Sequence, residues 1–468
     1  MPVRTLVSRL ALVAALGAFG VVTHPSTASA QSLSEALASA YNNNPTLLSE
    51  RANLRATDEN VPQALSGWRP TVQVTGTGGV QRNQVKQNSV AGTAAGTNNS
   101  SSSVLSPNSY GLTVTQPVYR GGRTVAQTSQ ALNLVQAERA TLAATEQTVM
   151  LNVITAYVNV VQSQATVDLN LNNEQVLRRQ LDATQDRFRV GEVTRTDVAQ
   201  AEASYAQAIA SRIQAQGTLQ SNRAIYEQQV GLPPGKLVQP TDIPPLPTSR
   251  EEAVAMAGAA NPSVISAQFA QQAAQDNIRV VRGQLLPQIS VQGSVQRSKE
   301  SQIVGRTTDS FELLGQVTVP LYEAGSVYSQ SRQAQQTVAQ RRNQVDVQRR
   351  TAVENAAAAW ETLLSDRATI KSQEASIRSN EIALEGVQQE AAVGSRTVLD
   401  ILNQEQTLFQ SRVNLVNSQH DEVIATFQLI SAVGRLTAQD LNLPVEIYNP
   451  DKNFNGVRDK WIGFDTPQ

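Results

Sequence analysis

The residues whose side chains could carry out chemistry are few in this sequence. Cysteine is absent, and histidine occurs only at His24 and His420. This composition excludes a cysteine nucleophile, a disulfide, a lipidated N-terminal cysteine and any site that needs several imidazoles. No carboxylate pair is marked out by its neighbours. We therefore expect no enzymatic activity and no cofactor.

Two turn sequences hold the polar residues of greatest interest. Each has a glycine, a threonine and an aspartate in the same order, and the second adds an arginine four residues before its aspartate. Glycine suits the position after a helix C-terminus, and threonine and aspartate are good N-caps for a return helix. The residues are Gly191, Thr194, Thr196 and Asp197 in the first turn, and Gly394, Arg396, Thr397 and Asp400 in the second. By itself the pattern predicts helix capping.

A third polar segment, Asp451 to Gly456, matches the first half of an EF-hand calcium loop. The bidentate acid expected at the last loop position is Ile462 instead. We favour an ordinary turn rich in Asp and Asn here, with calcium binding as the alternative.

Long helices must position the two turns. Residues 123–190 contain neither proline nor glycine, and residues 326–393 contain only Gly386. At 1.5 Å per residue each helix would be roughly 100 Å long. Apolar residues recur every 3.5 residues, which indicates helices supercoiled against partners along their length. Return helices are expected at about 197–230 and 400–433.

The sequence contains an internal repeat, in which the second half recapitulates motifs of the first. Asn44-Pro45 recurs as Asn261-Pro262 after 217 residues, and Pro117-Val118-Tyr119 recurs as Pro320-Leu321-Tyr322 after 203 residues. The second offset also relates the two turns. A period of this length indicates a duplicated domain half rather than a solenoid. We expect halves at 31–231 and 250–440, a stiff linker with six prolines at 232–249, and a C-terminal tail at 441–468.

Each half opens with a helical segment, at 32–66 and 250–284, and continues with two runs of alternating polar and apolar residues. These runs predict β-strands at about 70–82 and 109–119 in the first half and at about 287–297 and 310–321 in the second. The polar stretch at 83–108 is expected to be a solvated loop. The strand lengths are typical of transmembrane β-strands, but four strands are too few for a closed barrel. Several chains must therefore share one barrel.

Composition and the N-terminal residues point to export from the cytoplasm. Residues 1–30 have the basic start, apolar centre and Ala28-Ser29-Ala30 cleavage site of a signal peptide. No later stretch is apolar enough for a spanning helix. The net charge of −1 offers no basic surface for nucleic acid.

With these features in place, the chain resembles the TolC-like family of outer-membrane efflux proteins. The motifs that carry the resemblance are the two Asn-Pro pairs, Pro117 to Gly122 with Pro320 to Gly325, Arg187 to Gly191, and Val393 to Thr397. The resemblance implies an α+β membrane protein: a homotrimer with a twelve-strand barrel in the outer-membrane lipid and a twelve-helix tunnel across the periplasm. It also implies two partners, a periplasmic adaptor and an inner-membrane pump of the RND or ABC type. The pump supplies the energy for export, and the channel itself is passive.

The resemblance assigns roles to the turns. It implies a periplasmic gate in which Arg396 bonds across protomers to Thr196 and Asp197, and a ring of Asp400 residues that binds cations weakly. Gly191, Thr194, Gly394 and Thr397 become candidate contacts for the adaptor. Two positions depart from the family pattern. Ala391 stands where the gate tyrosine is expected, and Asn403 stands where a second acidic ring is expected. These departures predict a looser closed state and weaker cation binding.

Two questions stay open at the level of sequence. Within the family, the cargo is either small molecules or proteins exported by type I secretion. Outside it, the alternative is a trimeric coiled-coil structural or adhesin-like surface protein without transport.

Overall fold

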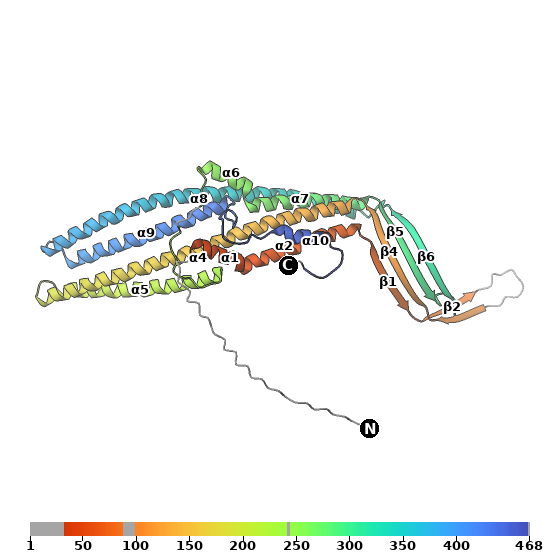
Figure 1. Cartoon of the computed structure of the whole chain (residues 1–468), viewed down its shortest axis with the longest axis horizontal. Coiled ribbons are helices and arrows are strands. Elements are labelled where there is room, and N and C mark those ends of the chain that lie inside the picture. Colours follow the sequence, from red (N-terminus) through yellow and green to blue (C-terminus); the bar gives the residue numbers. More distant parts are fainter. Residues whose placement is uncertain (1–31, 88–98, 241–243, 467–468) are drawn as a thin grey trace, which may run out of the picture.

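The computed structural model describes residues 32–87, 99–240 and 244–466. The predicted signal peptide and the centre of the predicted loop at 83–108 lie outside these residues. The described chain is elongated, with long paired helices at one end and a β-sheet at the other (Figure 1).

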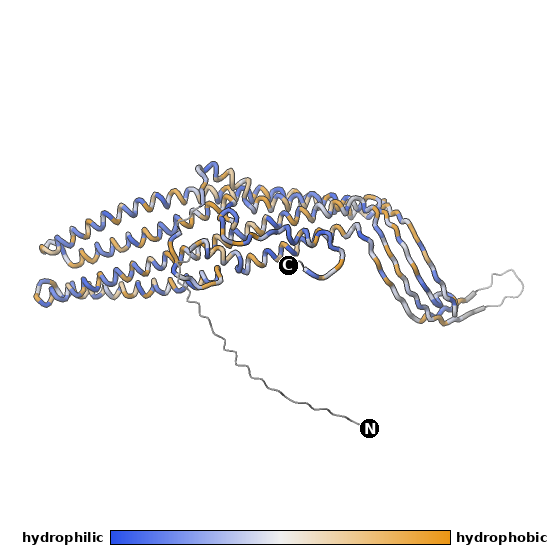
Figure 2. The backbone as a smooth tube through the Cα atoms, viewed as in Figure 1, coloured by the Kyte–Doolittle hydropathy of each residue, from blue (hydrophilic) through white to orange (hydrophobic). Residues whose placement is uncertain are grey.

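Two long helical hairpins form one end of the molecule. Helix α4 (Arg123–Arg189) packs along α5 (Arg195–Val230), and α8 (Ser326–Ala392) packs along α9 (Val398–Ala432). Helices α4 and α8 have 67 residues each. Their buried residues are mostly small or β-branched, which allows close approach along the whole length. Apolar and polar residues are interspersed along every helix (Figure 2), and none of the described helices is long and apolar enough to cross a membrane.

The segments expected to be helical at 32–66 and 250–284 are each divided into shorter helices. The first comprises α1 (Leu33–Asn43), α2 (Pro45–Asp58), α3 (Asn60–Leu65) and the 3-10 turn η1 (Ser66–Trp68). The second comprises α6 (Arg250–Ala260), α7 (Pro262–Arg282) and η2 (Gly283–Leu285).

Each Asn-Pro pair causes one of these breaks. Proline begins the new helix, and the asparagine before it caps that helix through its side-chain oxygen. The same asparagine donates its amide to the end of the return helix, from Asn44 to the Gln229 carbonyl at 3.0 Å and from Asn261 to the Ala432 carbonyl at 3.1 Å. The repeated motif therefore joins two elements in the same way in both halves.

The strands form one antiparallel sheet in the order β1-β4-β5-β6. Its members are β1 (Thr71–Gly78), β4 (Asn108–Arg120), β5 (Gln288–Lys299) and β6 (Thr307–Thr318). The strand expected at 70–82 is interrupted after Gly78. The stretch expected to be a solvated loop at 83–108 instead holds parts of a second hairpin, β2 (Gln81–Gln87) paired with β3 (Asn99–Leu105). Of its two strands β3 is rich in serine, and the two strands pair through their backbone groups from Gln81 with Leu105 to Gln87 with Asn99.

One face of the four-stranded sheet is apolar and the other is polar. Val74 lies opposite Leu112, Leu112 opposite Val295, and Val295 opposite Phe311. On the other face Gln73, Thr113, Ser294 and Glu312 follow one another across the strands. The apolar side chains are exposed in the single chain, with Val74 at 77% and Phe311 at 78%.

The largest cluster of buried apolar residues lies in the middle of the molecule, between the hairpin helices and the sheet; we call this region the waist. It gathers side chains from α1, α2, α4, α5, α9 and the segment after α9. At its centre the Tyr157 hydroxyl donates to the Val238 carbonyl at 2.7 Å, which fixes the linker between the halves against α4. The core thus holds the two halves together and sets the direction of both hairpins.

Candidate functional site

The first helix turn connects α4 to α5 and ends in a capping box. Gly191 has a left-handed φ of 81°, and its N–H donates to the Phe188 carbonyl at 3.0 Å. The Thr194 N–H and hydroxyl each donate to Asp197 Oδ2 at 2.8 Å, and the Asp197 N–H donates back to the Thr194 hydroxyl at 3.3 Å. Thr196 is exposed on the first turn of α5. Thr194 is therefore the N-cap, and α5 begins two residues before the expected start.

The second turn repeats this arrangement between α8 and α9. Gly394 has a φ of 82°. The Thr397 N–H and hydroxyl donate to Asp400 Oδ2 at 2.9 and 2.8 Å, and the Asp400 N–H donates to the Thr397 hydroxyl at 3.3 Å. These bonds from Thr397 hold the pKa of the Asp400 carboxyl below its usual value. Asp400 therefore stays negatively charged at the pH of any ordinary assay.

Arg396 has a partner that the sequence did not predict. Its Nε donates to Glu390 Oε2 at 2.8 Å, and both side chains are about half exposed, at 50% and 53%. The hydrogen bond to Glu390 and the charge of that carboxylate raise the pKa of Arg396. The first turn has a comparable pair, in which Arg187 Nε donates to Glu192 at 3.0 Å. The bond from Arg396 to a neighbouring protomer stays a prediction.

The two turns lie at the same end of the molecule. Val398 and Leu402 at the start of α9 pack with Leu177 of α4 and with Ala201 and Ala208 of α5. The structure thus brings the hairpins together just above the turns. Within the described chain, the hydrogen bonds found for Asp197, Arg396 and Asp400 stay inside their own turns.

Sequence reasoning passed over two exposed apolar residues at these turns. Val190 is 72% exposed and Val393 is 81% exposed. They are related by the repeat offset of 203, which was the signal available in the sequence. Ala391, at the expected position of the gate tyrosine, is only 3% exposed. The small Ala391 side chain is therefore covered by the rest of this chain.

The ordinary turn expected at Asp451 to Gly456 is wrong, because the segment is helical, and a helix also leaves no EF-hand loop for the calcium alternative. Helix α10 spans Pro450–Arg458. Asp451 pairs with Arg139 at 2.7 Å, and Asn453 donates to the buried Asp58 carboxylate at 2.7 Å. The side chains that would hold calcium therefore attach α10 to α2 and α4. Across the residues that the structure describes, no cluster of three or more His, Cys, Asp or Glu side chains could hold a metal ion.

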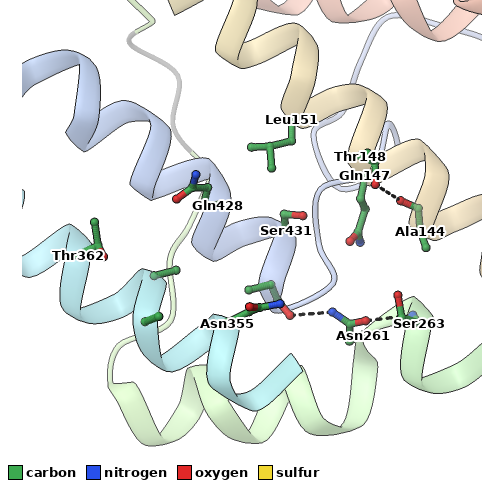
Figure 3. Close-up of a pocket in the computed structure, with 13 residues that line it drawn as sticks. Ala144, Gln147, Thr148, Leu151, Asn261, Ser263, Asn355, Thr362, Gln428 and Ser431 are labelled. Carbon is green, nitrogen blue, oxygen red and sulfur yellow. Dashed lines mark hydrogen bonds between the residues drawn. The ribbon is translucent and has the colours of Figure 1, made fainter. Parts of the chain in front are cut away.

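A cavity of about 520 Å³ lies at the waist, where α4, α7, α8 and α9 meet (Figure 3). Its lining is amide, hydroxyl and alkyl, and includes Gln147, Asn261, Asn355 and Gln428. Asn261 already donates to the Ala432 carbonyl as part of the repeated helix break. The lining offers no charged group or nucleophile activated by a base, so the cavity suits solvent between helices rather than catalysis.

His420 lies elsewhere and is also accounted for. Its ring nitrogens lie 2.8 Å from Asp421 Oδ1 and 2.6 Å from Asn159 Oδ1. The second contact joins α9 to α4, so the imidazole links the two hairpins.

Comparison with known proteins matches both halves of the chain. The family described as "Outer membrane efflux protein" matches residues 36–228 and 253–435. The outer membrane efflux protein BepC of Brucella suis is 34% identical over 451 residues, which cover 96% of this chain and 95% of BepC. The outer membrane protein TolC of Vibrio cholerae is 26% identical over 422 residues, which cover 88% and 92%.

Solved structures show the same fold at low identity. CusC superposes with a TM-score of 0.74 at 17% identity and covers 86% of this chain and 92% of its own. The outer membrane protein VceC of Vibrio cholerae gives a TM-score of 0.70 at 19% identity and covers 86% and 96%. The matched halves, the long hairpins and the two-faced sheet agree: this chain belongs to the TolC-like outer membrane efflux protein family and is an outer-membrane protein.

Proposed function

We propose that three copies of this chain form a passive channel across the outer membrane, continued by a helical tunnel through the periplasm. The observation that carries this proposal is the four-stranded sheet. Its outer strands are β1 and β6, which have no further strand beside them among the described residues. In a membrane these backbone groups need partners, so the sheet must close with other copies. The apolar face then meets lipid and the polar face lines the channel.

The repeat supports one way of joining the copies. Val72 lies opposite Val114 in the first hairpin, and Ile289 lies opposite Val317 in the second. The offsets of 217 and 203 carry the first pair onto the second, so the two hairpins share one register. Between the hairpins, Thr115 lies opposite Gln292. The same offsets carry this pair onto Thr318 of one copy and Thr75 of a neighbouring copy. The sheet would then continue between copies in the same register that joins the two hairpins within one chain.

The duct performs no reaction of its own. Its family members are efflux and secretion channels, and the described residues offer no catalytic constellation. We propose that an inner-membrane pump of the RND or ABC type supplies the energy and that a periplasmic adaptor joins it at the helix turns. Gly191, Thr194, Gly394 and Thr397 shape those turns, and exposed Val190 and Val393 add apolar surface for such a contact.

We place the gate at the same end. In the closed trimer Arg396 would leave Glu390 and bond to Thr196 and Asp197 of a neighbouring copy. Glu390 and Thr196 are exposed and Asp197 is half-buried, so the exchange would replace one solvent-accessible ion pair with another. The gate would therefore close weakly, and Asp400 would supply a single ring of carboxylates at the mouth.

Small-molecule efflux is the first candidate for the cargo, because BepC is named an efflux protein and matches almost the whole chain. Protein export is the second candidate, because the alkaline protease secretion protein AprF of Pseudomonas aeruginosa is 26% identical over 64% of this chain. Membership of an efflux family argues against the adhesin-like alternative.

Cross-linking tests the assembly. The chain has no cysteine, so Thr75→Cys combined with Thr318→Cys introduces the only thiols. Oxidation should yield a covalent trimer, because paired residues of adjacent strands lie within reach of a disulfide. Thr75→Cys with Val317→Cys is the matched control and should cross-link poorly, since a shift of one residue places the two side chains on opposite faces. Monomers from the first pair in the membrane would refute the shared barrel.

A deletion strain tests the transport. It should become sensitive to antibiotics and detergents if the duct serves efflux, or lose secreted proteins from the medium if it serves protein export. A strain unchanged in both respects, although the protein is normally expressed in the parent, would contradict the transport function.

A further inference from the structure

An apolar segment follows α10 and is left uncovered by the chain. Trp461 is 66% exposed, Ile462 is 91% exposed and Phe464 is fully exposed. Three large apolar side chains among four successive residues form a concentrated patch, unlike a single exposed leucine. Aromatic residues make up only 4% of the whole chain, so two of them among four successive residues are a local concentration.

The structure fixes this segment at one level of the molecule. Arg69 Nη1 donates to the Lys460 carbonyl at 2.7 Å, and the Arg69 guanidinium lies 4.8 Å from the centre of the Trp461 ring. Arg69 lies between η1 and the first residue of β1, Thr71. Lys460 and Trp461 are therefore held beside Arg69, close to where the helices give way to the strands, and the chain after them turns back toward the helices (Figure 1).

The same level carries other exposed aromatic residues. Trp68 precedes Arg69 and is 40% exposed, Tyr119 near the end of β4 is 39% exposed, and Tyr322 after β6 is 81% exposed. Tryptophan and tyrosine gather at the boundary between lipid chains and water, and arginine and lysine there reach the phosphates. The strand face that continues from this level is apolar, so the segment borders the surface assigned to lipid.

We propose that Trp461, Ile462 and Phe464 insert into the periplasmic leaflet of the outer membrane as an interfacial anchor. Arg69 and Lys460 beside them suit the phosphates of the phospholipid headgroups. The orientation rests on the proposed function, which places the helices in the periplasm. The anchor would fix the depth of the barrel from outside the strands, at the level of the helix-to-strand junction.

Tryptophan fluorescence tests the anchor in the full-length protein. The chain has three tryptophans, so Trp68→Phe with Trp360→Phe leaves Trp461 as the only one. The protein is reconstituted in phospholipid nanodiscs, with and without bromine on the acyl chains as a contact quencher. We expect brominated lipid to reduce Trp461 emission by about twofold, because interfacial tryptophans touch the upper acyl chain.

The matched control keeps Trp360 and replaces the other two tryptophans by phenylalanine. Trp360 lies in α8, ~50 Å along the helix from its first residue, and should show no quenching. Water-like and unquenched Trp461 emission would overturn the anchor. Blue-shifted but unquenched emission would overturn it as well, because a neighbouring copy would then cover the segment instead of lipid.

A second reporter avoids the tryptophan substitutions. Phe464→Cys gives a single thiol for an environment-sensitive dye, and Asp451→Cys on exposed α10 gives the control. In phospholipid nanodiscs the dye at 464 should emit at shorter wavelength than the dye at 451, and brominated acyl chains should quench only the dye at 464. Trimer formation by light scattering and conductance in planar bilayers are measured on the same labelled protein. A conducting trimer with a water-exposed segment refutes the anchor alone, whereas failure to form a trimer refutes the proposed function.

Discussion

Gly121→Ala should destabilise the junction between the sheet and the long helices. Gly121 has a φ of 63°, and a Cβ added there would lie 2.2 Å from the Gly283 carbonyl oxygen and 2.9 Å from the Leu286 Cβ. Gly283 belongs to the second half, so this contact holds the two halves together where the chain leaves β4 for α4. A backbone oxygen cannot move aside as a flexible side chain can.

Gly122 provides the matched control. It has a φ of 72°, and a Cβ added there meets nothing within 4 Å. An alanine with left-handed backbone costs about 1–2 kcal/mol, which both variants share. Overpacking against fixed atoms adds about 1–3 kcal/mol, which only Gly121→Ala incurs. We therefore expect a loss of about 1–2 kcal/mol for Gly122→Ala and about 2–5 kcal/mol for Gly121→Ala.

The second half supports this separation of the two effects. The repeat offset carries Gly121 onto Ala324, which adopts a φ of 50°. Alanine is thus accepted with the left-handed backbone at the equivalent position. Close approach to Gly283, rather than the backbone angle, is what requires glycine at 121.

The assay is thermal unfolding of the purified protein, followed by helical circular dichroism at one protein concentration and one heating rate. Gly121→Ala should unfold at a distinctly lower temperature than Gly122→Ala, and Gly122→Ala slightly below the parent. Equal unfolding temperatures for the two variants would refute the assignment of a steric contact at Gly121.

Three further predictions concern the gate and the response to pH. Arg396→Ser should raise the open probability in planar bilayers while Arg187→Ser, which removes a similar exposed pair in the other turn, should not; equal effects would refute the gate. Asp400→Ala should reduce block by multivalent cations, and the change should be smaller than in a channel with two acidic rings, because the proposed trimer would carry only one; unchanged block would place the cation site elsewhere. Burial, followed by the hydrogen bond and charge of Glu50, raises the pKa of Glu138 from 4.5 to about 7. The folded state therefore binds the proton more tightly, and the free energy of unfolding should fall as pH rises from about 4.5 to about 7. Glu138→Gln should flatten this dependence in a pH series of unfolding curves, and an unchanged slope would assign the titration to another group.

Local periodicity in the sequence was enough to predict the long helices and the strands. A helix was predicted at 123–190, and the structure has α4 from Arg123 to Arg189. The alternation in the strands predicted which side chains share a face, because side chains in a strand point to opposite sides in turn. The repeat predicted equivalent turns, and Thr194 with Asp197 and Thr397 with Asp400 form the same capping box. In each of these cases neighbouring residues carry the information.

Only the tertiary structure decided where polar side chains find their partners. Asn453 belongs to a helix attached to Asp58 rather than to a calcium loop, and Arg69 holds the backbone of Lys460. Arg396 pairs with Glu390 at its own turn. Several carboxylates lie near Arg396 in the sequence, and their spacing did not show which of them it would contact. The contact between Asn453 and Asp58 joins positions 395 residues apart. Such contacts form because the folded core removes alternative partners and water, and no local pattern in the sequence records that competition.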